Sequence, residues 1–368
     1  MYKNETLTAP LQVDFNVTNR CNLSCPYCYA SANERGKKES ELTLGEIEEL
    51  FDEFQKLGVL KVQIAGGEPL IREDAEEIFL LSKKFPFATL LNTNGTLLTE
   101  SLAKSIKKSG IFVTVSLEGN NSKLHDKIRN SPNSFEKAIG GIEKLKKANV
   151  NFAVGTTLNS LNISHIFEMI DFTKHLGAVF FAIQVLCPVG RSNQNSRIIP
   201  SQKDFKEFFL RLTKLKSEGR LPFEVRVNVT NESPVFWEYY YPLFQEKEGE
   251  ELMKIWNMDL NIRTGNQISC VAGRTVCSIE ANGDVYPCEM FLGEEEMVVG
   301  NLRKDSFKKI WATSLLFKEF RKLTKDKINN PCKNCPNEWC GAGCRAAAFS
   351  SARSITGCDF HCYYANQN

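Results

Sequence analysis

The 368-residue sequence lacks a long apolar run and lacks an apolar stretch at its start. The longest apolar run, "AVFFAIQVLCPV" at 178–189, contains a glutamine and is shorter than the roughly 20 residues that a helix needs to cross a bilayer. The first twelve residues, "MYKNETLTAPLQ", have no h-region of a secretory signal. We therefore expect a cytoplasmic protein with no membrane partner.

An excess of charge of one sign is also missing, and histidine is scarce. The 46 lysines and arginines balance 44 acidic residues, so we expect no nucleic-acid partner. Cysteine, in contrast, occurs 13 times against four histidines. In a reducing cytosol, clustered cysteines more often bind metal than form disulfides. The sequence therefore favours thiolate ligation of zinc or of iron–sulfur clusters.

Strand-like and helix-like stretches alternate from residue 11 to about 220. Six continuous apolar or β-branched runs are typical of strands buried on both faces, and they lie at 11–17, 60–66, 88–93, 111–117, 151–158 and 178–186. Six β–α repeats predict an α/β fold, a partial (β/α)6 TIM-like barrel with its chemistry at the C-terminal ends of the strands.

The rest of the chain changes character twice. We predict a barrel over residues 1–220, a bridging segment over 221–265 and a small cysteine-rich domain over 266–368. In the last of these, glycine, proline and cysteine dominate, and only 305–324 keeps a long helical pattern. A segment so poor in apolar residues needs metal clusters to stabilise it.

Three cysteines follow the first predicted strand with the spacing C-x3-C-x2-C: Cys21, Cys25 and Cys28. Three thiolates hold three irons of a [4Fe–4S] cluster and leave the fourth iron open. An open metal position is typical of catalysis. The alternative is a structural zinc site that lacks one ligand.

The segment "TNRCNLSCPYCYA" at 18–30 resembles the hallmark of the radical S-adenosylmethionine (SAM) superfamily. In that family the open iron binds SAM, and an electron from the cluster cleaves SAM to a 5'-deoxyadenosyl radical that abstracts a substrate hydrogen atom. The resemblance extends over roughly residues 10–220. It implies a [4Fe–4S] cluster, SAM and an electron donor of the flavodoxin or ferredoxin type.

The resemblance also implies SAM contacts at successive strand ends. These contacts are Gly66, Gly67, Glu68, Ser116, Arg129 and Asn159. In the family, "GGEPL" at 66–70 binds the SAM amino group and the arginine of "HDKIR" pairs with the SAM carboxylate, for which a fork of donors is suited. Taken alone, the first motif is also typical of an ordinary glycine turn, and Arg129 of a solvated base.

Nine further cysteines lie between residues 270 and 362, and we call them the second cysteine field. This field resembles the SPASM domain, an extension of radical SAM enzymes that holds up to two auxiliary [4Fe–4S] clusters. Four residues separate Cys335 from Cys340 here, whereas the family pattern has five. The resemblance implies one cluster on Cys270, Cys277, Cys288 and Cys344, and another on Cys332, Cys335, Cys340 and either Cys358 or Cys362. Two alternatives stay open: zinc ribbons, or a cluster with an open iron for a substrate thiolate.

Cys187 belongs to neither field and ends the sixth predicted strand in "QVLCPVGR". It is either a small buried hydrophobe or a catalytic thiol that donates a hydrogen atom to a substrate radical, as in some radical SAM epimerases.

The resemblance predicts oxidative crosslinking, through thioether or carbon–carbon bonds, of a ribosomally synthesised peptide. Only about 20 residues precede the first cysteine, so we expect either a separate leader-peptide-binding protein or a substrate without a leader. The alternatives are an epimerase of a peptide or sugar that uses Cys187, an oxidative decarboxylase of a porphyrin in haem synthesis, and a non-enzymatic iron–sulfur electron carrier.

Overall fold

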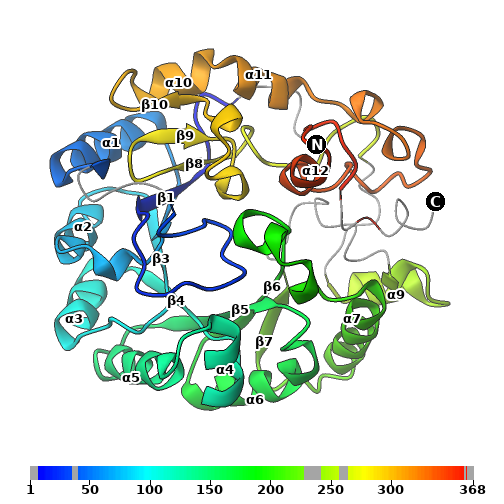
Figure 1. Ribbon diagram of the computed structural model, residues 1–368, viewed down its shortest axis with the longest axis horizontal. Coiled ribbons are helices and arrows are strands. Elements are labelled where there is room, and N and C mark those ends of the chain that lie inside the picture. The colour runs from blue at the N-terminus through cyan, green and yellow to red at the C-terminus, as the bar shows by residue number, and fades with distance from the viewer. Residues whose placement is uncertain (1–6, 35–39, 228–241, 257–263, 360–361, 363–368) are drawn as a thin grey trace.

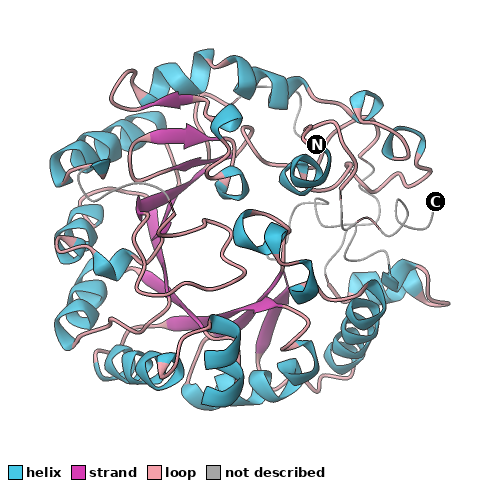
Figure 2. Cartoon of the chain, viewed as in Figure 1, coloured by secondary structure: helices cyan, strands magenta, loops and turns pink. Residues whose placement is uncertain are grey.

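The computed structural model describes residues 7–34, 40–227, 242–256, 264–359 and 362. One ten-stranded sheet runs through the described residues in the order β10-β9-β8-β1-β2-β3-β4-β5-β6-β7, with helices around its outside (Figures 1 and 2). The first seven strands are parallel to their neighbours. They are β1 (Gln12–Thr18), β2 (Lys61–Gly66), β3 (Ala88–Thr93), β4 (Phe112–Ser116), β5 (Phe152–Leu158), β6 (Phe180–Val185) and β7 (Glu224–Val227).

The six predicted strands are confirmed, each to within two residues at either end. A seventh parallel strand, β7, pairs with β6 and lies inside the segment that the sequence assigned to a bridge. Its four residues, "EVRV", alternate charged and apolar side chains, which is typical of a strand at the edge of a sheet rather than one buried on both faces. The proposed boundaries at 220 and 265 stay predictions, and most of the bridge lies outside the described residues.

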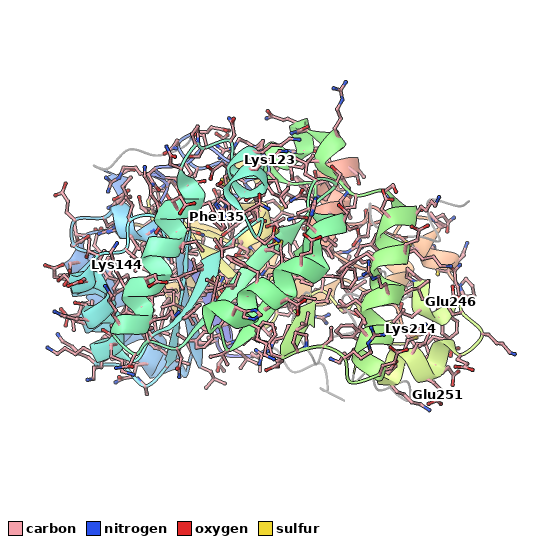
Figure 3. All side chains as sticks on the ribbon, turned by 90° about the horizontal axis from the view of Figure 1, so that it is seen from below. Lys123, Phe135, Lys144, Lys214, Glu246 and Glu251 are labelled. Atoms are coloured by element: carbon pink, nitrogen blue, oxygen red, sulfur yellow. The ribbon has the colours of Figure 1, made fainter. Side chains whose placement is uncertain are left out.

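Helices cover the outer face of the strands. They are α1 (Leu44–Leu57), α2 (Ala75–Ser82), α3 (Glu100–Ser109), α4 (Ser122–Arg129), α5 (Ser134–Lys147), α6 (Ile166–Leu176), α7 (Gln202–Ser217) and α9 (Gly249–Lys254). In Figure 3, Phe135 and Lys144 mark α5 and Lys214 marks α7 in this outer layer. None of the helices in the described part of the chain has the length and apolarity of a membrane span.

Helix α1 shows how local sequence positions these elements. Thr43 accepts a hydrogen bond from the backbone N–H of Glu46, and the Glu46 carboxylate accepts one from the backbone N–H of Thr43, which completes a capping box. Gly58 ends the helix with a left-handed φ of 78°. Phe51 and Phe54 on the inner face are fully buried.

The C-terminal part continues the barrel sheet rather than forming a detached unit. Strand β8 (Val276–Ile279) is parallel to β1, while β9 (Asp284–Tyr286) and β10 (Gly300–Asn301) follow antiparallel. The β8–β9 hairpin turns through the Asn-Gly pair of "IEANGDVYPCE", with Gly283 at a φ of 89°. Strand β8, which carries Cys277, pairs with β1, the strand that precedes Cys21, Cys25 and Cys28. The start of the second cysteine field therefore lies beside the strand that precedes the first three cysteines.

Among the described residues, this part also contains the helices α10 (Phe307–Thr313), α11 (Leu315–Lys322) and α12 (Arg345–Ala352). The helical pattern at 305–324 is two helices, because Ser314 ends the first and its hydroxyl caps the second at the backbone N–H of Phe317. Helix α10 packs on α1, where the rings of Phe54 and Phe307 lie 5.0 Å apart. The Trp311 indole N–H donates to the Leu7 carbonyl at 2.8 Å.

Candidate active site

Residues 19–34 follow β1, carry Cys21, Cys25 and Cys28, and cross the mouth of the barrel (dark blue at the centre of Figure 1). We call this segment the cluster loop. Asn33, at a left-handed φ of 72°, accepts a hydrogen bond from the backbone N–H of Cys21 at 2.7 Å. The Arg191 side chain donates to the Cys25 carbonyl at 2.8 Å, and its backbone N–H donates to the Cys28 carbonyl at 3.0 Å. The backbone around the three thiols is therefore fixed from two sides.

Gly66 and Gly67 lie where the end of β2 packs against Thr18, at the end of β1, and against Arg20, just before Cys21. Gly66 has a φ of 134°, a backbone conformation that residues with a side chain rarely adopt. A Cβ on Gly66 would overlap the Thr18 carbonyl oxygen, and one on Gly67 would overlap the Arg20 carbonyl oxygen. Both glycines are therefore required by the packing of two backbone segments beside the cysteines.

Glu68 joins the ends of β2 and β3 beneath the cluster loop. It is 1% exposed, and its carboxylate accepts hydrogen bonds from the Thr93 hydroxyl at 2.6 Å and from the backbone N–H groups of Asn94 and Leu70 at 2.7 and 3.2 Å. Burial raises the pKa of Glu68, and these three donors oppose the rise. A carboxylate has about four acceptor positions, so one remains for a ligand such as the SAM amino group.

Arg129 reaches the cluster loop from the last turn of α4. Its guanidinium donates to the Glu118 carboxylate at 3.1 Å, and Nη1 lies 3.5 Å from Cys25 Sγ. Its Nε–H is buried without a hydrogen-bond partner. A buried donor without a partner costs free energy, so this atom fits a bound acceptor such as the SAM carboxylate.

Glu118 is the buried anion that orients Arg129. It is 1% exposed and also accepts from the Thr156 hydroxyl at 3.0 Å and from the backbone N–H of Thr157 at 2.9 Å. The His125 ring accepts from the backbone N–H of Glu118, and burial lowers the pKa of His125 to about 3. His125 is therefore neutral and holds the loop in place.

The other two predicted SAM contacts differ in what they already bind. Asn159 is fully buried, donates to the Thr157 carbonyl at 2.8 Å and accepts from the backbone N–H groups of Leu161 and Asn162. One amide hydrogen of Asn159 remains for a ligand. Ser116 ends β4 half-buried.

Sequence reasoning missed one contact to the cluster cysteines. The Asn94 side-chain amide lies 4.0 Å from Cys21 Sγ and donates to the Asn22 side chain at 2.9 Å. The segment "NTNG" at 92–95 has the composition of a turn, and its position at the end of β3 is the signal that could have indicated this contact. An N–H near a thiolate stabilises the ionised form that binds iron.

Three cysteines of the second field come together: Cys270, Cys288 and Cys344. The negative charges of Cys270 and Cys344 both raise the pKa of the Cys288 thiol. The charge of Cys344 also raises the pKa of Cys270. Each of the three sulfurs also accepts a hydrogen bond from at least one backbone N–H. The Cys344 sulfur accepts two, from the backbone N–H groups of Ala346 and Ala347 in the first turn of α12. Such N–H···S bonds suit thiolates that hold a metal cluster.

Cys187 joins this group, because its thiol forms a hydrogen bond with Cys344. This hydrogen bond lowers the pKa of Cys344 to about 7, while the pKa of Cys187 is raised by the same bond and by burial. The structure therefore places Cys187 against the second cysteine field, at the end of β6.

The structure does not bring Cys277 to this group. Cys277 lies on β8 opposite Val13, is fully buried and packs in the barrel core. The charges that act on its thiol come from Asp14 and Arg321. Burial raises the pKa of Cys277 well above its usual range.

A second group contains Cys332, Cys358 and Cys362. Cys332 forms a side-chain hydrogen bond with Cys358, and the negative charge of Cys362 raises the pKa of Cys332. Cys335 follows within the same turn, its backbone N–H donating to the Cys332 carbonyl at 3.2 Å. Cys340 packs beside Trp339 against the barrel core.

None of the thirteen cysteines forms a disulfide. No group of three or more His, Cys, Asp or Glu side chains within the described ranges is arranged to hold a single metal ion.

Two family models match the chain. Residues 15–173 match the radical SAM superfamily, and residues 270–336 match the iron–sulfur cluster-binding SPASM domain. The two matches have the order that the cysteine spacings predicted.

Curated relatives match nearly the whole chain. An AdoMet-dependent heme synthase of Methanosarcina barkeri is 27% identical over 97% of both chains. The mycofactocin maturase MftC of Mycolicibacterium smegmatis is 24% identical over 97% of this chain and 83% of its own. SuiB of Streptococcus suis, solved with S-adenosylmethionine, shares the fold with a TM-score of 0.75 at 20% identity, over 97% of this chain and 78% of that one.

Proposed function

We propose that this chain, which belongs to the radical SAM superfamily and carries a C-terminal SPASM domain, modifies a ribosomally synthesised peptide by oxidative crosslinking. SAM, when bound beside the first cluster, supplies the carbon radical that removes one substrate hydrogen atom. A second hydrogen must leave as a proton and an electron before a crosslink closes. The second cysteine field would hold the iron–sulfur clusters that accept this electron.

The observation that carries this proposal is the position of Cys28. Cys28 packs against two apolar clusters: one contains Cys25 and also borders Cys21, and the other contains Cys270 and also borders Cys288 and Cys344. Both clusters contact Cys28, and this arrangement supports electron transfer from the first cysteine group to an auxiliary cluster. A reaction that returned the electron to the substrate would not need this arrangement.

The residues of the chain supply binding and orientation. Arg129 presents its free Nε–H beside Cys25, Glu118 fixes the guanidinium, and Glu68 keeps one acceptor position. Arg129 is also 5.8 Å from the ring centroid of Tyr27, which adds a cation–π contact. These groups would hold the amino-acid end of SAM at the open iron.

A peptide substrate is supported by two comparisons and one feature of the site. MftC is a maturase, and SuiB has been solved with its precursor peptide SuiA. The three arginines at the cluster loop are already paired with carboxylates: Arg20 with Glu41, Arg129 with Glu118 and Arg191 with Glu34. They offer little charge to a substrate that carries several carboxylates.

A second candidate is oxidative decarboxylation of a porphyrin side chain. It is favoured by the heme synthase of M. barkeri, which aligns with 97% of this chain. This reaction also leaves one electron for an acceptor, so the position of Cys28 supports it equally. Only the substrate separates the two candidates.

The test is an anaerobic reaction of the reconstituted full chain with SAM and a reductant. One arm contains the short peptide encoded nearest to this gene, and the other contains Fe-coproporphyrin III. A peptide product lighter by two hydrogens per event supports crosslinking, whereas a porphyrin product lighter by carbon dioxide and two hydrogens identifies the decarboxylase. An unchanged mass with one deuterium gained in heavy water would instead indicate an epimerase.

The Cys25→Ala variant is the control for the radical chemistry. It removes one of the three thiols at the mouth, so SAM cleavage to 5'-deoxyadenosine should stop with either substrate. Continued release of 5'-deoxyadenosine by this variant would contradict the proposed role of the loop.

A further inference from the structure

The auxiliary cysteine group includes a thiol that comes from the barrel. Cys270 belongs to an apolar cluster against which Cys288 and Cys344 pack. The Cys187 thiol, just after β6, forms a hydrogen bond with Cys344. A thiol from the barrel therefore lies against the cysteine group of the C-terminal part.

The segment around Cys187 is held against both cysteine fields. The Ser350 hydroxyl, on α12, donates to the Pro188 carbonyl. On the other side, Gly190 has a φ of 57°, and a Cβ there would overlap the Tyr29 carbonyl oxygen. The Ser192 hydroxyl donates to the Cys187 carbonyl at 2.7 Å. Residues 187–192 are thus fixed between the loop of the first cluster and the helix that begins after Cys344.

Cys277 lacks each of these features. Its side chain is packed in the barrel core, whereas Cys270, Cys288 and Cys344 belong to or border a different apolar cluster. The charges that affect the Cys277 thiol are those of Asp14 and Arg321, not those of other cysteines. No backbone N–H contributes to the stabilisation of its thiolate, in contrast to Cys270, Cys288 and Cys344. A [4Fe–4S] cluster requires thiolates around a common centre.

We propose that Cys187 is the fourth ligand of the auxiliary [4Fe–4S] cluster held by Cys270, Cys288 and Cys344. The donor set fits the group, since it consists of four thiols of which three accept backbone hydrogen bonds. The cluster then joins the end of β6 to the SPASM domain through a metal–thiolate bond. The proposal depends on the SPASM domain holding a cluster and not on the identity of the substrate.

This ligand would leave the cluster closed. All four irons would carry a protein thiolate, so no position would remain for a substrate thiolate. It would also occupy the thiol that an epimerase would need for hydrogen donation. Cys277 would be a buried apolar residue of the barrel core.

The experiment uses the full chain with Cys21, Cys25 and Cys28 replaced by alanine, so that only auxiliary clusters contribute to the signal. Into this background we would introduce Cys187→Ala, Cys187→Ser and, as the matched control, Cys277→Ala. Each protein is reconstituted anaerobically, and iron, sulfide, EPR spectra and reduction potentials are measured. None of these readouts depends on turnover.

Loss of the fourth thiolate should make one iron labile. We expect Cys187→Ala to give a [3Fe–4S]-type EPR signal after mild oxidation, and Cys187→Ser to shift the reduction potential of one cluster, because an oxygen ligand replaces sulfur. Cys277→Ala should keep the spectrum of the background protein. The serine variant conserves side-chain volume and so controls for altered packing.

Two outcomes would overturn the proposal. If Cys277→Ala gave the [3Fe–4S]-type signal and both Cys187 variants kept the parent spectrum, Cys277 would be the ligand. If neither position changed the spectrum, the cluster would have an open iron, which addition of a small thiol to the parent protein would reveal as a shifted EPR signal.

Discussion

At the scale of single residues, the buried pair of Glu118 and Arg129 is the feature whose loss should cost most. Arg129 is nearly buried, and Glu118 is its only carboxylate partner within 4 Å among the described residues. The Glu118→Gln variant would leave the guanidinium without a counter-charge. We expect the free energy of unfolding to fall by about 3 kcal/mol.

Urea unfolding of the reconstituted protein under anaerobic conditions measures this change. The matched control is Glu48→Gln, which removes one partner of the exposed ion pair with Lys84 and should cost less than about 1 kcal/mol. Equal losses in the two variants would show that the Arg129 charge is compensated by other groups, such as the Cys25 sulfur.

Asp14 gives the second prediction at this scale, and it concerns pH. Burial raises the pKa of Asp14 to about 6, and the hydrogen bond from Gln12 only partly offsets the rise. The folded state therefore binds a proton that the unfolded state releases above its ordinary carboxyl pKa near 4. The stability associated with Asp14 should be complete below about pH 4 and be lost as the pH rises to about 6.

The variant Asp14→Asn should remove this dependence. It should be more stable than the parent by roughly 2–3 kcal/mol at pH 7.5 and equal to it at pH 4. Urea unfolding at the two pH values measures the difference. A constant difference between the two proteins at both pH values would indicate that the Asp14 carboxyl titrates in the folded state as it does in the unfolded chain.

Much of the site could be predicted at the residue scale, because each short motif places its own residues at a strand end. Gly67 and Arg129 were found in this way, and both lie against the cluster loop. The hydrogen bond between Cys187 and Cys344 could not be predicted. It joins residues 157 positions apart, and it depends on how α12 packs on the end of β6.

At the scale of elements, the strands were predictable because each is a continuous apolar run, whereas two other elements were not. Strand β7 has only four residues and alternates with charge. Helix α12, "RAAAFSSA", has little apolar periodicity, because its alanines are buried on several sides. Its buried Arg345 donates to the carbonyls of Ile355 and Gly357, a tertiary contact that no local pattern indicates.

The junction of β2 with the cluster loop carries the prediction at this scale. A Cβ at position 67 would overlap the Arg20 carbonyl, so Gly67→Ala must displace the backbone next to Cys21. We expect reconstituted protein to lose most of the iron of the first cluster while it keeps the auxiliary iron. Gly140→Ala is the control, because no atom lies within 4 Å of a Cβ there and its backbone is helical.

Iron and sulfide per chain, measured after anaerobic reconstitution, decide between the two cases. The Gly140 variant should match the parent. If Gly67→Ala also kept the full iron content and its SAM-dependent EPR change, the cluster loop would tolerate a shift of its backbone, and the glycine would serve another purpose.

At the scale of the whole molecule, the barrel and the C-terminal part share one sheet and one core. Strand β8 pairs with β1, and the apolar core cluster extends from Phe15 and Phe54 to Phe307 and Phe317. The two parts should therefore unfold together. Phe307 is the point at which this coupling can be tested, because it is fully buried and its ring lies 5.0 Å from that of Phe54.

The Phe307→Ala variant should lower the free energy of unfolding by about 3–5 kcal/mol, the usual cost of removing a buried aromatic ring. Because the cavity lies between α1 and α10, barrel helicity and auxiliary-cluster absorbance should be lost at the same, lower temperature. Leu315→Ala is the control, since Leu315 is 82% exposed and its loss should change stability by less than about 0.5 kcal/mol. If the cluster absorbance of the Phe307 variant disappeared well before the helicity, the C-terminal part would be an independent unit that merely rests on the barrel.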